Sequence, residues 1–405
     1  KTNDELRRQI LFILCQALNT EFLPDVSQNV YIEGKLYPKD ELTNVTPNIL
    51  SKTTRRLHLQ PRHPISILRT LIEAHFNEFQ HFNSFSPVVT AAQNFDDLGF
   101  PEDHPGRGAT DSYYVNKSIM LRTHTSAHQL QAFRSGAEKF LISADVYRRD
   151  EIDSCHYPIF HQMEGAQIFN MSNVAEETLR DIDKTAFQPT ESISTDDDTV
   201  IGSNNPIQPC HPIEAANAAT MHLKHTLNVM VRRLFKEEKD LKVRWIDAYF
   251  PFTSPSWEME ILYKGKWLEI CGCGVVKQEL LDKAGRPDKI GWAFGLGLER
   301  ISMILFDIPD IRLFWSQDSR FMDQFKPGEI TKFQAFSKYP SCTKDISFWI
   351  NDEREQGFHD NDFCEVVRDV AGDLAELVEL IDDFTHPKTK KRSLCYRINY
   401  RSMDK

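Results

Sequence analysis

The run VRWIDAYF (243–250) is followed by WEMEILY (257–263), KWLEICGCGVV (266–276) and IGWAFGLGL (290–298). The first run alternates, imperfectly, between apolar and polar side chains, as a strand with one buried face does. Strands that follow one another without helices between them build antiparallel sheets. We therefore expect an antiparallel sheet in an α+β fold, with its last strand running into a helix at Glu299–Phe306.

The sequence upstream of this sheet adds further elements to the same domain. Strand-like runs cover 87–90, 113–115, 140–147 and 166–169, and apolar residues at helical spacing cover 4–18, 65–79 and 213–237. Residues 171–212 have the composition of an insertion. Within it we interpret 190–212, which is acidic and then rich in turn residues, as a mobile surface loop.

A second module is predicted after Pro327 and Gly328. Its order is strand (345–350), helix (362–376), strand (378–385), basic turn and strand (393–400). Split β-α-β units of this kind build ferredoxin-like α/β sandwiches, whose closing helix and strand we expect to be missing here. The expected division is an N-terminal helix and extension (1–40), a main domain (41–310), a linker (311–330) and a truncated C-terminal module (331–405).

Composition limits the class of protein. The 405 residues carry 48 Lys and Arg against 59 Asp and Glu, a net charge of −11 that argues against a general nucleic-acid coat protein but allows a local basic groove. The 8 Cys are too sparse for a disulfide scaffold and fit a reducing compartment. No apolar run approaches the roughly 20 residues that cross a bilayer, so we expect no membrane span.

Two segments place polar groups close together. Residues 121–129 bring Ser126, His128 and Gln129 into a short span suited to orienting a polar ligand, although a capped helix start is the plainer interpretation. The hairpin from Arg148 to Glu164 begins with a guanidinium that can grip phosphate or form surface ion pairs. Its return strand puts Phe160, Gln162 and Glu164 on one face and Ile159, His161 and Met163 on the other. The first face suits an amino group or a base.

Two further segments add aromatic rings and glycines. Phe250 and Phe252 are two residues apart, so both rings lie on one side of an extended chain, as a clamp for a ring-bearing ligand or as core aromatics. In the run from Gly291 to Arg300, the glycines allow a ligand to approach the backbone, and Arg300 can lie flat on a ring or form a salt bridge. Glu269 lies in a strand, where a carboxylate needs a partner or a metal such as Mg²⁺.

These segments, in this order, resemble the class II aminoacyl-tRNA synthetases, and within them the phenylalanyl-tRNA synthetases of the monomeric organellar type. Arg148-Arg149-Asp150 is similar to the second signature of the class, and Gly295-x-Gly297-x-Glu299-Arg300 to the third. The His124-Thr-Ser126 run, the strand from Phe160 to Glu164 and the Phe250-Pro-Phe252 clamp are similar to the phenylalanine branch. Ala293, where the general signature has Gly, also matches that branch. The likeness covers roughly residues 30–405 apart from 190–212.

The resemblance implies a role for each site residue. The catalytic residues would be Arg148 and Arg300. ATP would be bound by Arg148, His156, Tyr157, Phe160, Glu269 and Arg300, and Mg²⁺ by Glu269. Phenylalanine would be bound by Ser126, His128, Gln129, Gln162, Glu164, Phe250, Phe252, Ala293 and Phe294.

The resemblance also implies a fold, an activity and partners. The fold is the class II antiparallel sheet flanked by helices, followed by a ferredoxin-like anticodon-binding sandwich. The activity is ATP-dependent formation of phenylalanyl-adenylate and transfer to the 3′-terminal adenosine of tRNA(Phe), by a monomer in the mitochondrial matrix. The expected partners are ATP, Mg²⁺, L-phenylalanine and tRNA(Phe), with no membrane.

A basic hairpin is the main candidate for tRNA contact. The stretch between Thr385 and Arg401 contains no acidic residue. The basic residues in it that are proposed to bind tRNA are Lys388, Lys390, Lys391, Arg392 and Arg397. A solvated turn is the plainer alternative. A second basic group comprises Lys52, Arg55, Arg56, Arg62 and Arg69. Two other functions stay open: another class II synthetase, and a synthetase-like protein that has lost catalysis and only holds tRNA.

Overall fold

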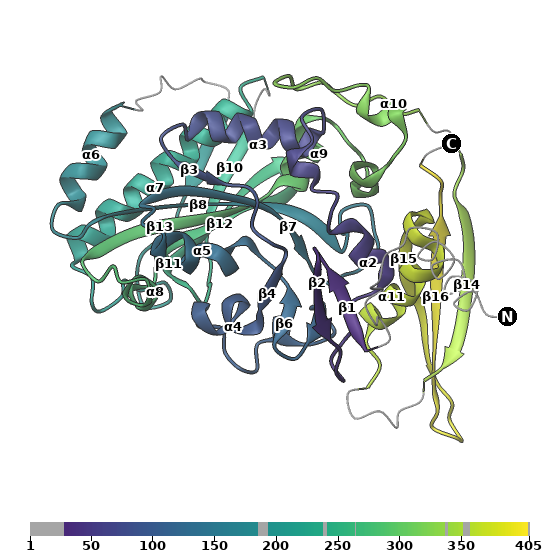
Figure 1. Cartoon of the computed structure of the whole chain (residues 1–405). Helices are drawn as coiled ribbons and strands as arrows, with labels where there is room; N and C mark the ends of the chain where they lie inside the picture. Colours follow the sequence, from purple (N-terminus) through teal and green to yellow (C-terminus); the bar gives the residue numbers. More distant parts are fainter. Residues whose placement is uncertain are drawn as a thin grey trace, which may run out of the picture.

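The protein is described by a computed structural model covering residues 28–184, 193–237, 241–263, 265–336, 339–350 and 357–403. The helix expected at 4–18 lies outside the described residues. An 8-stranded sheet forms the centre of the main domain, in the order β3-β7-β8-β13-β12-β11-β10-β9 (Figure 1). Its strands are β3 (Gln80–Phe82), β7 (Lys139–Tyr147), β8 (Ile159–Asn170), β9 (Ile193–Asp197), β10 (Leu241–Asp247), β11 (Thr253–Tyr263), β12 (Lys266–Val276) and β13 (Lys289–Gly297).

The strand pairing confirms the antiparallel sheet expected from the sequence. The six central strands, from β7 to β10, pair antiparallel with one another. Only the outermost pairs, β3 with β7 and β9 with β10, are parallel. The strands predicted from residues 243 to 298 are therefore neighbours in space as well as in sequence.

One face of this sheet is covered by α3 (Pro64–His75), α7 (Ile213–Leu234) and α9 (Leu298–Leu305) (Figure 1). Trp292, Phe294 and Leu296 of β13 point toward these helices and are fully or almost fully buried in the same apolar cluster. Pro64 begins α3, where its missing N–H costs no hydrogen bond. The apolar stripes of the three helices thus form the main core with the back of the sheet.

On the opposite face, the middle parts of β12 and β13 carry almost no side chains. Register pairs Gly295 of β13 with Gly272 of β12, and Ala293 with Gly274. A Cβ added at Gly295 or at Gly297 would meet no atom within 4 Å. The missing side chains leave a trough along the middle of this face, because residues directly opposite each other in an antiparallel pair share one face.

Short elements close the sides of the trough. Small apolar contacts from α5 (Gln129–Arg134) and α8 (Gln278–Lys283) cover the far end of this face. The other elements before residue 129 are β1 (Asn29–Ile32), β2 (Lys35–Pro38), α2 (Pro47–Lys52), η1 (Leu57–Leu59), β4 (Val88–Thr90), α4 (Ala91–Asn94), η2 (Asp96–Leu98), η3 (Pro105–Arg107), β5 (Tyr114–Asn116), β6 (Ile119–Leu121) and η4 (Thr125–His128).

The interpretation of 190–212 as a mobile surface loop is wrong for Ile193–Asp197, which form β9, whereas residues 198–212 contain no helix or strand. β9 adds an edge strand to the sheet, and Asp197 at its end forms an ion pair of 2.8 Å with Lys224 of α7. Asn205 binds Asp247 and the backbone of Ser256. Earlier in the predicted insertion, ahead of β9 in the chain, residues 174–184 form α6 (Val174–Lys184). The polar composition is that of an edge strand, which finds its backbone partners on β10.

The segment expected as a linker, 311–330, packs against the main core. It forms η5 (Ile311–Trp315) and α10 (Ser319–Met322). Phe314, Trp315, Phe321 and Phe325 are almost completely buried in the main apolar cluster. These aromatic side chains make the segment part of the main domain.

The C-terminal module is a three-stranded antiparallel sheet in the order β14-β16-β15 with one helix. Its elements are β14 (Cys342–Trp349), α11 (Asp360–Ala371), η6 (Gly372–Leu374), β15 (Ala375–Thr385) and β16 (Arg392–Tyr400). Helix α11 ends at Ala371, before the predicted limit at 376. The next residue, Gly372, adopts φ +56°. Figure 1 shows the module at one end of the molecule, with α11 turned toward the main domain.

The contact between module and main domain is partly buried. Cys364 and Val367 of α11 pack on Ile152, which lies in the hairpin loop between β7 and β8. The side chain of Arg368 donates hydrogen bonds to the carbonyl oxygens of Asp150 and Glu151 in the same loop. In the described residues, no helix has both the length and the apolar content needed to cross a bilayer.

Candidate active site

A hollow of about 300 Å³ opens over the glycine trough, between β8, β12 and β13. Its lining includes Gly295 and Gly297 at the floor, and Arg148, Phe160, Gln162, Glu269 and Arg300 around them. Side chains from three of the stretches singled out in the sequence therefore lie together: the hairpin that begins at Arg148, the strand of Glu269 and the run that ends at Arg300.

Glu164 forms the centre of the polar part of the site. It is 2% exposed and accepts hydrogen bonds from Ser126 Oγ at 2.5 Å, Gln129 Nε2 at 2.9 Å and Thr125 Oγ1 at 3.4 Å. Burial raises the pKa of this carboxyl to about 7, and the three donors only partly offset that effect. Near neutral pH, Glu164 is poised between its neutral and ionised forms, and a cationic ligand would favour ionisation.

Two hydrogen bonds fix the polar residues next to Glu164. The backbone N–H of Thr125 donates to Gln162 Oε1 at 3.2 Å, which joins η4 to β8. Arg148 donates from Nε to the carbonyl oxygen of Thr123 at 2.9 Å, and its guanidinium lies 5.2 Å from the centre of the Phe160 ring. The guanidinium is thus held in place while its other N–H groups stay available to a ligand.

Aromatic rings line the other side of the site. Phe250 and Phe252 stack with centroids 6.1 Å apart, and Phe252 lies 6.0 Å from Phe100. Phe250 sits over Gly272, where a Cβ would come within 2.7 Å of its ring. Ala293 belongs to the apolar cluster on which Phe252 packs. A slot between rings and a small floor residue suits a flat apolar side chain.

Carboxylates gather at the rim beside Arg300. Glu269 Oε2 lies 3.5 Å from Nη1 of Arg300. Glu258 is half-buried opposite Gly272, and burial, followed by the charges of Glu269 and Glu260, raises its pKa. A divalent cation would relieve this repulsion between carboxylates, so Glu258 and Glu269 fit a Mg²⁺ that also touches phosphate.

Comparison with known protein families agrees with the resemblance to class II aminoacyl-tRNA synthetases found in the sequence. Residues 47–189 and 213–325 match the family described as "tRNA synthetases class II core domain (F)". The chain belongs to the class II tRNA synthetases. Residues 337–405 match the "Ferredoxin-fold anticodon binding domain". This synthetase is therefore an enzyme, a ligase, and its expected fold class is confirmed.

Curated relatives cover nearly the whole synthetase. "Phenylalanine--tRNA ligase, mitochondrial" of Saccharomyces cerevisiae is 47% identical over 93% of this chain and 89% of that protein. The protein of the same name from Mus musculus is 46% identical over 92% of this chain and 82% of its own length. "Phenylalanine--tRNA ligase, chloroplastic/mitochondrial" of Arabidopsis thaliana is 46% identical over 90% and 77%.

Phe294 does not lie in the synthetase's site. It is adjacent to Ala293 in β13, so the two side chains point to opposite faces. The Phe294 ring packs on Gly165 and lies 5.5 Å from Phe76, inside the main core. The alternation that placed Phe160 apart from His161 gave the same signal here, and only Ala293 belongs to the cleft.

His128 and Tyr157 are also turned away. The ring of His128 stacks on Phe85 at 4.5 Å and its Nε2 faces Arg122 at 3.0 Å, so it supports the floor of η4 and does not face Glu164. Tyr157 borders the hollow, but its hydroxyl donates to Asp373 of the C-terminal module at 2.6 Å. Hydrogen-bond partners distant in sequence decide both orientations.

His156 lies at the rim on the loop between β7 and β8. Its Nδ1 is 2.8 Å from Asp153 Oδ2, and this hydrogen bond is the main cause that raises the pKa of His156. Glu151, Asp153 and His156 are the one group of three or more potential metal ligands found close together among the described residues. All three sit on the loop that α11 contacts.

Two site residues were missed by the sequence analysis. The ring of His124 stacks on Phe100 at 5.5 Å and lies 6.3 Å from Phe252, so it belongs to the aromatic slot. Burial, followed by the charge of Arg148, lowers the pKa of His124 to about 3, which keeps the ring neutral. Glu258 is the other. His124 stood inside a recognised motif, whereas Glu258 resembled any polar residue of a strand.

The basic groups differ in how free their charges are. All five residues of the second group are already bound: Lys52 to Asp373, Arg55 to the carbonyl oxygen of Trp315, Arg56 to Glu33, Arg62 to Asp323 and Arg69 to Glu73. In the hairpin, Arg392 and Arg397 pair with Asp383 and Asp345. Lys388, Lys390 and Lys391 are exposed.

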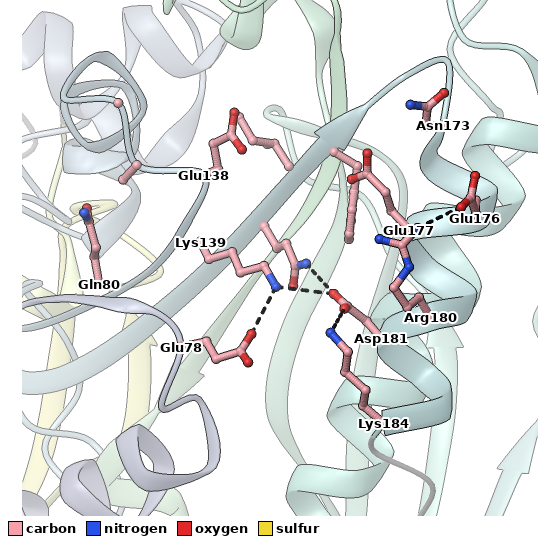
Figure 2. Close-up of a pocket in the computed structure, with 15 residues that line it drawn as sticks. Glu78, Gln80, Glu138, Lys139, Asn173, Glu176, Glu177, Arg180, Asp181 and Lys184 are labelled. Atoms are coloured by element: carbon pink, nitrogen blue, oxygen red, sulfur yellow. Dashed lines mark hydrogen bonds and ion pairs between the residues drawn. The ribbon is translucent and has the colours of Figure 1, made fainter.

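A larger hollow, of about 680 Å³, lies elsewhere, beside α6 (Figure 2). Lys139 reaches Glu78 and Asp181 across it, and Asp181 also accepts from Gln167. Figure 2 shows Lys139, Glu78 and Asp181 pointing toward one another. Lys139 is paired with both carboxylates, as Lys184 is with Asp181, so these charges already have partners within the protein.

Proposed function

We propose that this chain is a mitochondrial phenylalanine–tRNA ligase that works as a monomer in the matrix. The observation that carries the proposal is the buried carboxylate of Glu164, held by Ser126 and Gln129, beside the aromatic slot of Phe250 and Phe252. A free amino acid with an ammonium group and a phenyl ring fits both halves. The names of the relatives, which are phenylalanine–tRNA ligases, support phenylalanine as the substrate.

Phenylalanine binds across this pair of features in the proposal. Its ammonium meets Glu164, with Ser126, Gln129 and Gln162 around it, and its ring enters the slot over Ala293. The methyl of Ala293 narrows the floor, which disfavours a ring with a para-hydroxyl. An apolar pocket rejects an added hydroxyl only about a hundredfold, so slow activation of tyrosine is expected.

ATP binds on the other half of the trough. Phe160 and Arg300 enclose the adenine, while Arg148 contacts the α-phosphate and His156 approaches the outer phosphates. The carboxylate of phenylalanine attacks the α-phosphorus of ATP, and the bond from that phosphorus to the oxygen that bridges to the β-phosphate breaks. Phenylalanyl-adenylate forms and pyrophosphate leaves. Arg148 stabilises the charge that develops on the α-phosphate, and the remaining residues hold the reactants in line.

Mg²⁺ would be held by Glu269, with Glu258 as a second carboxylate. When bound, it neutralises charge on the phosphates. In the second reaction a ribose hydroxyl of the 3′-terminal adenosine attacks the acyl carbonyl and AMP leaves. The protein contributes orientation to this step as well.

The proposed contact with tRNA(Phe) is the hairpin around Lys388, Lys390 and Lys391. Exposed aromatic side chains lie next to this hairpin. The centre of the Trp349 ring is 6.5 Å from that of Phe384 and 6.4 Å from that of His386. Lysines beside exposed rings are suited to phosphates and unstacked bases of a single-stranded loop. Arg392 and Arg397 brace the hairpin through their acids.

The first test is ATP–pyrophosphate exchange driven by phenylalanine. Arg148→Ala should lose at least about a hundredfold in exchange, as removal of one transition-state donor does. Arg149→Ala is the matched control, because the guanidinium of Arg149 binds the carbonyl oxygen of Ala109 and Asp362 outside the hollow. Exchange with another amino acid alone would assign the chain to a different class II synthetase. Absence of exchange in folded protein would favour the tRNA-holding alternative.

The state and location in the cell are tested separately. Light scattering of the purified protein should give the mass of one chain, and a dimer would contradict the monomer. Fractionation of mitochondria should place the protein with matrix markers.

A further inference from the structure

Glu299 and His161 make a buried contact at the edge of the hollow, whose lining includes Glu299 but not His161. Glu299 is 2% exposed and His161 is fully buried. The carboxylate accepts from the ring Nδ1 of His161 at 2.7 Å and from the backbone N–H of His161 at 2.7 Å. One side chain of α9 therefore holds both the ring and the backbone of one residue of β8.

The contact lies where the sheet loses a strand. Pairing between β13 and β8 ends at Gly297 and Gln162, so β13 supplies no partner to the next residue of β8. Glu299 fills that place, because its carboxylate receives the N–H of His161 that a strand would have received. The chain thus turns from β13 into α9 without leaving a buried donor unpaired.

The neighbours of this pair in sequence are the cleft residues. His161 lies between Phe160 and Gln162, which point to the opposite face of β8, and Glu299 precedes Arg300. The ring of His161 is fixed further by Trp315 at 6.0 Å and His58 at 5.3 Å. A shift of either residue would change the spacing between Phe160 and Arg300.

We propose that Glu299 and His161 are a positioning pair that sets the spacing of the adenine site between Phe160 and Arg300. The inference rests on the proposed role of those two residues in binding ATP. The pair acts through the position of its neighbours, so its loss should weaken ATP binding and slow adenylate formation more than it weakens phenylalanine binding at Glu164.

The test compares variants that keep or remove the hydrogen bond. Glu299→Ala and His161→Phe should each raise KM for ATP and lower kcat about tenfold or more in phenylalanine-dependent exchange, since misplacement by about 1 Å costs up to a hundredfold. KM for phenylalanine should change less than KM for ATP, because Gln162 is the one residue of the proposed phenylalanine site that adjoins the pair in sequence. His161→Asn places an amide N–H near the position of Nδ1 and should stay within about threefold of the wild type for both ATP constants. The double variant should be no worse than the poorer single variant.

His222→Phe is the matched structural control. His222 is a buried histidine of α7 that accepts from Trp292 Nε1 at 2.9 Å behind the sheet. It should lower the thermal midpoint without changing KM for ATP. If His161→Phe behaves like this control, or if His161→Asn is as poor as His161→Phe, the positioning role is overturned.

Calorimetric titration with ATP and Mg²⁺, without phenylalanine, separates the two proposals. A wild-type protein that binds ATP but shows no exchange with phenylalanine would contradict the proposed function alone. Equal ATP dissociation constants for the wild type, Glu299→Ala and His161→Phe would contradict the positioning pair alone.

Discussion

At the residue scale, Glu164 shows how one environment sets both affinity and stability. Its carboxyl is taken out of water by the sheet and η4, and it receives three hydrogen bonds from uncharged donors with no cation among them. The protein therefore maintains a costly anion for a ligand that brings the missing positive charge. That trade-off between binding and stability is common at functional sites.

Phenylalanine binding should depend on pH through Glu164. With a pKa of about 7 in the free protein, the carboxyl is mostly protonated at pH 6 and mostly ionised at pH 8. KM for phenylalanine should therefore rise severalfold as the pH falls from 8 to 6, and binding at pH 7 should release a proton. Titration calorimetry in buffers of different ionisation enthalpy measures that proton. Binding without proton exchange at pH 7 would contradict the raised pKa.

Glu164→Gln should lose phenylalanine binding and gain stability at alkaline pH. Because the folded pKa lies above 4.5, the folded protein holds more protons than the unfolded chain between about pH 4.5 and 7, so the free energy of unfolding falls as the pH rises through that window. Removing the charge should recover up to about 3 kcal/mol at pH 8. Gln129 can turn its amide to accept from the new donor.

Denaturant unfolding at pH 5 and pH 8 checks this. The free energy of unfolding should fall between pH 5 and pH 8, and it should fall further in the wild type than in the variant. A variant less stable than the wild type at both values would show that the carboxylate hydrogen bonds outweigh its desolvation.

At the element scale, β12 and β13 work by what they lack. Their glycines and Ala293 keep one face open, while Trp292, Phe294 and Leu296 fill the other. A strand with bulky residues on alternate positions only can support a core and a ligand trough at once. The cleft is thus a property of the strand pair and its register.

Gly295→Ala should impair activity without harming the fold. Its Cβ would enter open space within the trough, where nothing lies within 4 Å, so it should obstruct the ligand and leave packing unchanged. We expect exchange to fall at least about tenfold and the thermal midpoint to change by less than about 2 °C, in line with a surface substitution. Differential scanning fluorimetry and exchange assays measure the two effects.

Gly291→Ala is the opposite case on the same strand. Its Cβ would lie 2.1 Å from the carbonyl oxygen of Gln167, so it should destabilise the protein by several kcal/mol. Similar stability losses for both glycines would mean that Gly295 is packed rather than open.

Local pattern predicted much of this architecture. Consecutive strands without helices between them in 243–298 predicted the antiparallel sheet, and the face shared by Phe160, Gln162 and Glu164 predicted the polar half of the site. Partners distant in sequence decided the rest. No local signal shows that Tyr157 bonds Asp373, that β9 pairs with β10, or that His161 faces Glu299.

At the scale of the whole molecule, the C-terminal module grips the loop that carries Asp150 and His156. Arg368 of α11 binds the carbonyl oxygens of Asp150 and Glu151, and Tyr113 donates to Glu365 at 2.7 Å. The same loop follows Arg148 directly. The position of the module and the geometry of the proposed ATP site are therefore physically joined.

Arg368→Ala should destabilise the protein by about 3 kcal/mol, because it removes a buried guanidinium and leaves two carbonyl oxygens and Glu365 without that partner. Arg180→Ala is the matched control, since its pair with Glu176 is exposed and should contribute less than about 1 kcal/mol. Urea unfolding followed by tryptophan fluorescence compares the two. Equal effects would mean that the contact of α11 with the loop contributes little.

The hairpin of the C-terminal module should account for part of the salt dependence of tRNA binding. Lys388, Lys390 and Lys391 are exposed, whereas Arg392 is committed to Asp383, so replacing the three lysines by Ala removes charge without breaking the hairpin. For each lysine that binds a phosphate, its replacement should reduce the slope of log K against log salt by about 1. Filter binding of tRNA(Phe) between about 50 and 200 mM salt measures the slope.

A triple variant of the main domain separates the hairpin from net charge. Lys117, Lys242 and Lys266 are exposed there, and their replacement by Ala changes the net charge by the same amount. If both triple variants reduce the slope equally, the effect belongs to net charge and the hairpin is only a solvated turn. A reduced slope in the hairpin variant alone, with phenylalanine-dependent exchange unchanged, would separate tRNA binding in this module from activation in the main domain.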